Sequence, residues 1–247
     1  MSRIEKSAWS VLALLLLIPL WYLAAAQATF IESPGTVLKA LPHFLSSADT
    51  WSNIGITLAR VLGGLALGIA AGFVAAFIMA RSAFLGEVLG YYVTAALRTP
   101  SAIAAILALA IFKGSEAGYV LVVAFITFPY MAVGMRDGLK SADRELDEMA
   151  QIYHLGLLAK VRHIWVPFVA PYVFAALRNA HALAWKVIVV AEIFGAARMG
   201  FGAKFDHAWE YMLMIEVHLW LLVFMVIVLL AEYGLIRNLE KYTFRWR

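Results

Sequence analysis

Ionisable side chains occur along the apolar stretch 166–196, where few would be expected. Arg178, Trp185 and Glu192 follow one another at intervals of seven residues, so they fall close to one line on a helix, and Lys186 lies on the adjacent line. Charged groups inside a membrane are costly and are functional candidates by default. This stripe could attract an anion at Arg178 or Lys186 along a path through the membrane, or it could consist of structural pairs that lock helices together.

The choice between attraction of an anion and structural pairing differs from one residue of the stripe to the next. Arg178 and Glu192 lie roughly 21 Å apart along a helix axis, so they cannot pair with each other. A structural role is favoured for both, and Glu192 is expected to pair with a cation on another span. For Lys186 the two roles stay open.

A second candidate for the path is the sequence Arg98-Thr99-Pro100-Ser101, which interrupts the apolar stretch 88–112. Proline removes a backbone hydrogen bond and frees a carbonyl, which a membrane helix tolerates where the opening faces a cavity or another helix. Arg98, Pro100 and Ser101 are therefore candidate parts of a gate, and a plain structural kink is the equal alternative.

Several kinds of chemistry are excluded by residues that the sequence lacks. No cysteine is present, which excludes disulfides and thiolate metal sites, and the six histidines show no HExxH or other ligand spacing. A GxxxxGK[ST] phosphate-binding loop is absent, and no cluster resembles a catalytic constellation. We therefore expect no metal, no cofactor and no enzymatic activity in this chain.

The composition indicates a membrane protein. Of the 247 residues, 64% are hydrophobic and 15% are charged, and the mean hydropathy is +0.83, whereas a water-soluble domain rarely exceeds about half apolar residues. A bilayer core needs roughly 20 apolar residues per helix. The sequence therefore predicts an all-α fold in membrane lipid with about six spans, at 8–28, 54–80, 88–112, 116–135, 166–196 and 215–236. The first is expected to be an uncleaved anchor rather than a signal peptide, because its apolar run is long.

Lysine and arginine are distributed unevenly between the two sides of the membrane. With the N-terminus inside, twelve fall in cytoplasmic segments and four in outside loops, so the positive-inside rule predicts two cytoplasmic termini. The net charge of +4 follows from this asymmetry and does not indicate nucleic-acid binding. The twelve are Arg3, Lys6, Arg81, Arg136, Lys140, Arg144, Lys160, Arg162, Arg237, Lys241, Arg245 and Arg247, and the four are Lys39, Lys113, Arg198 and Lys204.

This topology divides the chain into four parts. They are an N-terminal transmembrane helix (1–30), a periplasmic connection (31–53), a core of five spans (54–240) and a cytoplasmic tail (241–247). Within the core, the cytoplasmic loop 136–165 is long for a connection between helices, which indicates a function of its own.

The second span carries a packing signal. Gly64, Gly68 and Gly72 recur every four residues, and the ridge of small residues continues through Ala76 and Ala80. Such a ridge lets two backbones approach closely, either within the chain or between subunits. Arg60, near the outer end of this span, is expected to snorkel to the lipid headgroups.

The loop 136–165 contains a short amphipathic helix in which Met149, Ile152 and Tyr153 share one face. A short helix held outside the membrane next to a spanning helix is suited to docking on a soluble partner. The alternative is a solvated linker, but a linker lacks such apolar periodicity.

The same loop carries a recognisable motif. The sequence Glu-Met-Ala at 148–150, followed by Pro167 at 19 residues after Glu148, resembles the EAA loop of ATP-binding cassette (ABC) importer permeases. The stretch 184–192, with Gly-Phe-Gly at 200–202 after it, resembles the branch of that family that imports nitrate, sulfonates, taurine and related small organic anions.

The resemblance implies a type I ABC importer permease-like core with a cytoplasmic coupling helix, in the bacterial inner membrane. It implies two copies of an ATPase subunit, a second permease chain as in a homodimer, and a periplasmic solute-binding protein. His154 stands where the family has a glycine, so we expect the bend of the loop to be shifted toward Gly156. The residues implied to couple to the ATPase are Glu148, Met149, Ala150, Ile152, Tyr153, His154 and Gly156.

Two alternatives remain for the function. The same machine could carry a thiamine precursor, a pyrimidine or an aromatic acid. A stand-alone secondary transporter is less favoured, because it predicts inverted internal repeats or carboxylate relays inside the membrane. No clear repeat is found, and Glu192 is counted as the only carboxylate well inside a span.

Overall fold

The computed structural model describes residues 16–112, 114–141, 144–236 and 238. Every regular element in this part of the chain is a helix, which confirms the predicted all-α class. After a first helix, Leu16–Gln27, the elements are α2 (Pro34–Ser46), α3 (Ala48–Arg81), α4 (Ala83–Arg98), α5 (Ser101–Phe112), α6 (Glu116–Lys140), α7 (Arg144–Ile152), α8 (Leu157–Lys160), the π-helical turn η1 (Val161–Trp165), α9 (Val166–Phe194), α10 (Phe201–Glu210), α11 (Met214–Leu230) and a second π-helical segment, η2 (Ala231–Ile236).

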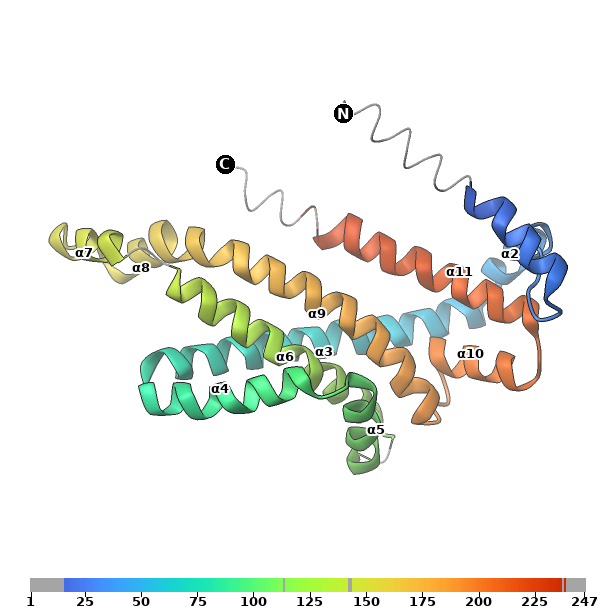
Figure 1. The fold of residues 1–247 in the computed structure, drawn as a ribbon, viewed down its shortest axis with the longest axis horizontal. Helices are drawn as coiled ribbons and strands as arrows, with labels where there is room; N and C mark the ends of the chain where they lie inside the picture. Colours follow the sequence, from blue (N-terminus) through green and yellow to red (C-terminus); the bar gives the residue numbers. More distant parts are fainter. Residues whose placement is uncertain (1–15, 113, 142–143, 237, 239–247) are drawn as a thin grey trace, which may run out of the picture.

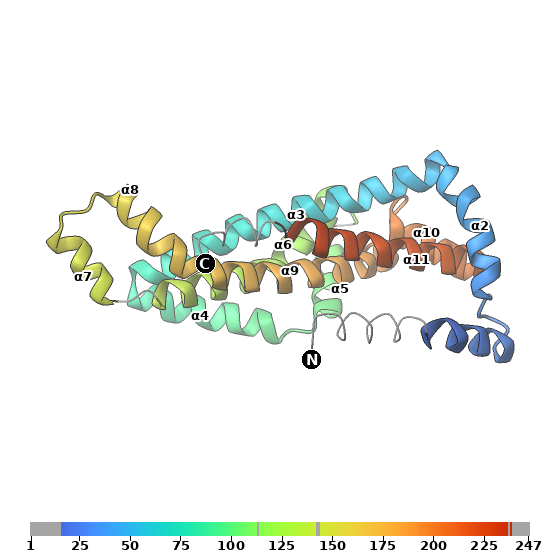
Figure 2. The ribbon, with the colours of Figure 1, turned by 90° about the horizontal axis from the view of Figure 1, so that it is seen from above.

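The centre of the bundle is formed by α3, α6 and α9, which run side by side along its long axis (Figures 1 and 2). The glycine ridge of α3 faces α6. An added Cβ would overlap the Val123 side chain at Gly64 and the Thr127 side chain at Gly68. Gly72 lies equally close to α6, so the ridge packs within the chain rather than between subunits.

The predicted span over 88–112 is not straight, because the chain turns by 105° between α4 and α5. The predicted interruption at Pro100 is confirmed, since α4 ends at Arg98 and α5 begins at Ser101. At the end of α4 the Thr99 hydroxyl donates to the carbonyl of Ala95 at 2.9 Å. This bond closes the last turn of α4 before the proline.

Among the residues that the structure describes, four helical runs are long and apolar enough to cross a bilayer, and α4 with α5 would make a fifth if they form one broken span. The four are α3, α6, the run Leu158–Phe194 and the run Met214–Gly234. The first predicted span, 8–28, begins outside the described residues, and only its apolar part Leu16–Gln27 is seen. The predicted tail 241–247 also lies outside them.

The two ends of the bundle carry different short helices. Figure 1 shows α7 and α8 projecting beyond the bundle at one end, beside the turn between α3 and α4, while α2 and α10 lie at the other end. Because α3 and α9 run most of the length between them, these two helices can place side chains at both ends of the membrane domain.

Candidate functional site

The carboxylate of Glu192, near the end of α9, is completely buried and fully hydrogen-bonded. Its Oε1 accepts from Arg60 Nη1 at 2.7 Å and from Thr57 Oγ1 at 2.8 Å, and its Oε2 accepts from the Gly202 amide at 2.7 Å. A buried charge is tolerated only when it is paired and hydrogen-bonded in this way. The expected pairing of Glu192 with a cation on another span is confirmed, and the cation is Arg60.

The guanidinium of Arg60 joins three elements at this end of the bundle. Besides Glu192 it holds Glu116, at the start of α6, through a fork of Nη2–Oε1 at 2.6 Å and Nε–Oε2 at 2.9 Å. It also donates to the Met199 carbonyl at 2.8 Å and lies 4.4 Å from the ring centre of Tyr119. The prediction that Arg60 snorkels to headgroups is wrong, because only 3% of its side chain is exposed and it pairs with the fully buried Glu192, although its other partner, Glu116, is 75% exposed.

The same cluster holds the segment between α9 and α10. The Gly200 amide donates to Asn53 Oδ1 at 2.8 Å, and the Phe201 amide donates to Thr57 Oγ1 at 2.7 Å. Gly200 has φ of 126°, a conformation that favours glycine. These bonds fix the start of α10 to α3, so this cluster, which we call the Arg60 cluster (Asn53, Thr57, Arg60, Glu116 and Glu192), organises one end of the bundle.

A second polar cluster joins α9 to η2 nearer the other end. Arg178 Nε lies 3.3 Å from Glu232 Oε1, and His181 Nδ1 lies 3.5 Å from Glu232 Oε2. The indole nitrogen of Trp185 donates to His181 Nε2 at 2.8 Å, so the proton of a neutral His181 lies on Nδ1 and faces Glu232. His181 Nδ1 forms no hydrogen bond with any residue in the described part of the chain.

Sequence reasoning missed Glu232 and its link to His181. Counting Glu192 as the only carboxylate well inside a span overlooked Glu232, although the predicted span 215–236 includes it. Trp185 is 3% exposed and packs edge-on against Phe224 of α11, with ring centres 5.8 Å apart. The structure therefore brings Arg178 and Trp185 into one cluster, away from Glu192, and gives Trp185 a packing position in the bundle.

Lys186 differs from Arg178, the other cation of the predicted stripe. It is exposed on α9, between the two clusters, and no carboxylate among the described residues lies within 4.0 Å of its ammonium group. Exposed neighbours on the same side of the helix are Ala175, Asn179 and Ala182. A lipid-facing helix surface usually carries large apolar side chains, so this small and polar stripe is better suited to water or to another protein surface.

The three residues of the predicted gate lie at the bend between α4 and α5. Arg98 and Pro100 are exposed, whereas Ser101 is half-buried. A small cavity of about 90 Å³ lies against this bend, lined by Thr99 and Ser101 and by Leu183 of α9. The bend therefore lies close to α9 at Leu183, about one helical turn from Lys186. No hydrogen bond or ion pair joins Arg98 or Ser101 to Lys186 among the described residues.

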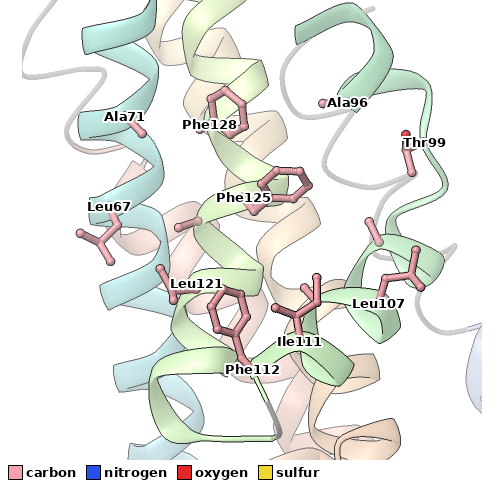
Figure 3. Close-up of a pocket in the computed structure, with 13 residues that line it drawn as sticks. Leu67, Ala71, Ala96, Thr99, Leu107, Ile111, Phe112, Leu121, Phe125 and Phe128 are labelled. Carbon is pink, nitrogen blue, oxygen red and sulfur yellow. The ribbon is translucent and has the colours of Figure 1, made fainter. Parts of the chain in front are cut away.

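A larger groove, of about 750 Å³, lies between α3, α4, α5 and α6 (Figure 3). Phe112, Phe125 and Phe128 line it, and Thr99 is its one polar lining residue. Such a wall offers almost no hydrogen bonds to a charged solute, so the groove is suited to an acyl chain or a neighbouring helix.

The predicted coupling residues form an elbow at the far end of the bundle. Ile152 and Tyr153 are 74% and 73% exposed, and Leu158 in α8 is 82% exposed. Met149 is also exposed, but Ala150 is only 2% exposed and faces the inside of the elbow. Exposed large apolar side chains outside a bundle indicate an interaction surface.

The bend of this elbow lies at His154, not at Gly156 as expected. His154 has φ of 50°, and the Leu155 amide donates to the Ala150 carbonyl at 2.9 Å. This bond joins residues five positions apart, as the wider of the two hydrogen bonds of a Schellman motif does. That motif places a residue with left-handed backbone conformation just after the helix. The hydrogen bond closes the end of α7 at His154, so the histidine adopts the conformation for which the family pattern has glycine.

Comparison with known proteins agrees with this geometry. Residues 64–239 match the family model described as "Binding-protein-dependent transport system inner membrane component". The riboflavin transport system permease protein RibX of Chloroflexus aurantiacus is 29% identical over 213 residues, which cover 83% of this chain and 79% of RibX. The putative aliphatic sulfonates transport permease protein SsuC of Bacillus subtilis is 24% identical, with coverages of 91% and 81%. The nitrate import permease protein NrtB of Synechococcus elongatus is 23% identical, with coverages of 79% and 78%.

A solved structure supports the fold. The crystal structure of an amino acid ABC transporter with histidines matches with a TM-score of 0.64 at 18% identity, over 83% of this chain and 96% of that one. The family match covers residues 64–239, which include most of α3 and all the helices from α4 to α11. The chain therefore belongs to the family of binding-protein-dependent transport system inner membrane components, and it is a multi-pass permease subunit of an ABC importer rather than an enzyme.

Proposed function

We propose that this chain and a second copy of it form the translocation pathway for a small organic or inorganic anion, such as a sulfonate, taurine or nitrate. A periplasmic solute-binding protein delivers the solute, and two ATPase subunits dock on the elbows of the two copies. Two of the relatives are named for aliphatic sulfonates and for nitrate, which are anions.

The observation that carries the choice of an anion is the state of Lys186. Arg60 of α3 and Arg178 of α9 each have a carboxylate partner in the structure. Lys186 keeps an ammonium group on an exposed, small and polar helix face, without a carboxylate nearby among the described residues. In a medium of low dielectric constant such a charge attracts an anion far more strongly than in water.

Replacing Lys186 by Met should weaken uptake of an anionic solute at least tenfold and leave assembly of the complex intact. The substitution shortens the unbranched side chain by only one atom and removes its charge, so the lost attraction would affect the solute and not the packing. The measurement is uptake into proteoliposomes with the binding protein at saturating concentration. Lys186→Arg, which keeps the charge, should retain most of the uptake.

Uptake by the Lys186→Met variant also distinguishes an anionic solute from the second candidate solute. RibX is named for riboflavin, so a heteroaromatic solute is the alternative, in line with a thiamine precursor, a pyrimidine or an aromatic acid. An uncharged heteroaromatic solute should be transported equally well by Lys186→Met. If nitrate and sulfonate uptake by the Met variant equals that of the wild type, the anion proposal is contradicted.

The orientation has its own test. The twelve-to-four distribution of Lys and Arg predicts that both termini and the elbow lie in the cytoplasm. A reporter that is active only outside should be active when fused after Gly114 and inactive when fused after Ser141. A reporter that is active only in the cytoplasm should give the opposite result, and reversal of both would contradict the docking of the ATPase on the elbow.

A further inference from the structure

A cavity of about 480 Å³ opens at the end of the bundle where α3 turns into α4, next to the end of α6. Figure 1 shows this turn at the same end of the molecule as α7 and α8. The cavity lies at the helix ends, and therefore at the level where the chain leaves the apolar part of a bilayer. Its lining combines apolar with charged residues: Met79, Ala80, Ala83, Gly86, Glu87, Arg136, Leu139 and Lys140.

Two glycines of α4 lie close to residues that line the cavity, and one of them, Gly86, lines it itself. A Cβ atom at Gly86 would lie 2.7 Å from the Met79 carbonyl oxygen, so only glycine lets α4 begin so close to α3. At Gly90 an added Cβ would lie 3.8 Å from Nη1 of Arg136. The guanidinium of Arg136, on α6, therefore lies against the face of α4 that carries Gly90.

The charges around this cavity do not neutralise one another. Arg136 donates from Nε to Asp137 at 3.3 Å, and its Nη atoms have no hydrogen-bond partner within the described ranges. Among the same residues no ion pair within 4.0 Å joins Glu87 to Arg136 or to Lys140, although all three line one cavity. Because Glu87 lines the same cavity as Arg136 and Lys140 without pairing with either, the cavity has room for a ligand that carries both a positive and a negative group.

We propose that this cavity binds the headgroup of an aminophospholipid, phosphatidylethanolamine. Arg136 and Lys140 hold its phosphate, for which guanidinium groups supply a fork of donors. Glu87 holds its ammonium group, and Met79 and Leu139 contact the first part of the acyl chains. Basic pockets between membrane helices at the cytoplasmic side are typical sites for lipid headgroups. The choice of the cytoplasmic leaflet rests on the proposed orientation, but the binding itself does not.

The test is retention of lipid by the purified permease–ATPase complex, measured by native mass spectrometry after incubation with defined lipids. At equal concentrations, phosphatidylethanolamine should be retained at least fivefold more than phosphatidylcholine or phosphatidylglycerol. Glu87→Gln should abolish the preference over phosphatidylglycerol, and Arg136→Ala should reduce retention of all three lipids. Arg162→Ala, which removes a cation at the same end but outside the cavity, should change neither.

Several outcomes would overturn the proposal. Equal retention of the three lipids, or a preference for phosphatidylglycerol that survives Glu87→Gln, would show that no zwitterionic headgroup is recognised. Displacement of the retained lipid by inorganic phosphate at millimolar concentration would show a free-anion site instead. Because Arg136→Ala could misfold, Arg136→Lys serves as a second variant, and it should keep the preference with weaker retention in a monodisperse complex.

Discussion

Ile152→Glu should separate the permease from its ATPase, or uncouple ATP hydrolysis from transport, with at least a tenfold loss of transport. Ile152 is 74% exposed at the tip of the elbow, next to Tyr153, which is 73% exposed. Complete burial of one such apolar side chain in a partner's groove is worth roughly 1.5–3 kcal/mol, which corresponds to roughly a tenfold to a hundredfold change in affinity. A buried charge without a partner adds to this loss.

Two further substitutions show whether the contact or the elbow itself is affected. His154→Gly should leave coupling intact, because glycine adopts the left-handed conformation at φ of 50° more easily than histidine does. Ala150→Glu should also abolish transport, but for another reason, since Ala150 faces the inside of the elbow and is 2% exposed. The measurements are co-purification of the ATPase and solute-stimulated ATP hydrolysis. Normal values for Ile152→Glu would remove the elbow from the coupling mechanism.

Much of the fold could be predicted because it follows from local patterns. Hydropathy located the long helices α3, α6, α9 and α11, since each is a long apolar run. Pro100 indicated an interruption, but the 105° turn that follows it depends on how α5 packs against α6 and α9. No local feature of the sequence encodes that packing.

The polar clusters were harder to predict because their members lie far apart in the chain. Arg60 and Glu192 are separated by 132 residues, and a single sequence gives no sign that they meet. The cost of burying Glu192 required a cation somewhere, which was predicted, but the choice of Arg60 depends on the close contact between α3 and α9. Glu232 was overlooked for a simpler reason, since it stands near the end of a span, where a charged residue is ordinary.

The position of the bend at His154 could not be predicted from the sequence for a different reason. The family pattern places its glycine at position 154, but the conformational freedom of glycine favoured a bend at Gly156, because position 154 holds a histidine. The hydrogen bond from Leu155 to Ala150 instead fixes where α7 ends, and this bond requires a left-handed residue at position 154 whatever its side chain.

Arg60→Met should lower the thermal stability of the permease strongly, because it leaves the carboxylate of Glu192 buried without its cation. Removing one partner of a buried ion pair costs about 3–5 kcal/mol. For a chain of this size that corresponds to a decrease of roughly 6–20 °C in Tm, measured on the purified complex in detergent. Arg60 also holds the Met199 carbonyl and Glu116, so the segment before α10 should become more accessible to proteolysis.

A double variant separates the charge from the packing. In Arg60→Met with Glu192→Gln no charge is left inside, while the amide can still bond to Thr57 and Gly202, so at least half of the lost stability should return. Lys204→Met is the matched control, because Lys204 and Asp49 form an exposed pair at 2.8 Å near the same end. Exposed pairs contribute about 0–1 kcal/mol, so its Tm should stay close to that of the wild type. If Arg60→Met lowers Tm no more than Lys204→Met does and still abolishes uptake, then Arg60 acts on the solute, and the Arg60 cluster is part of the pathway rather than a lock between α3, α6 and α9.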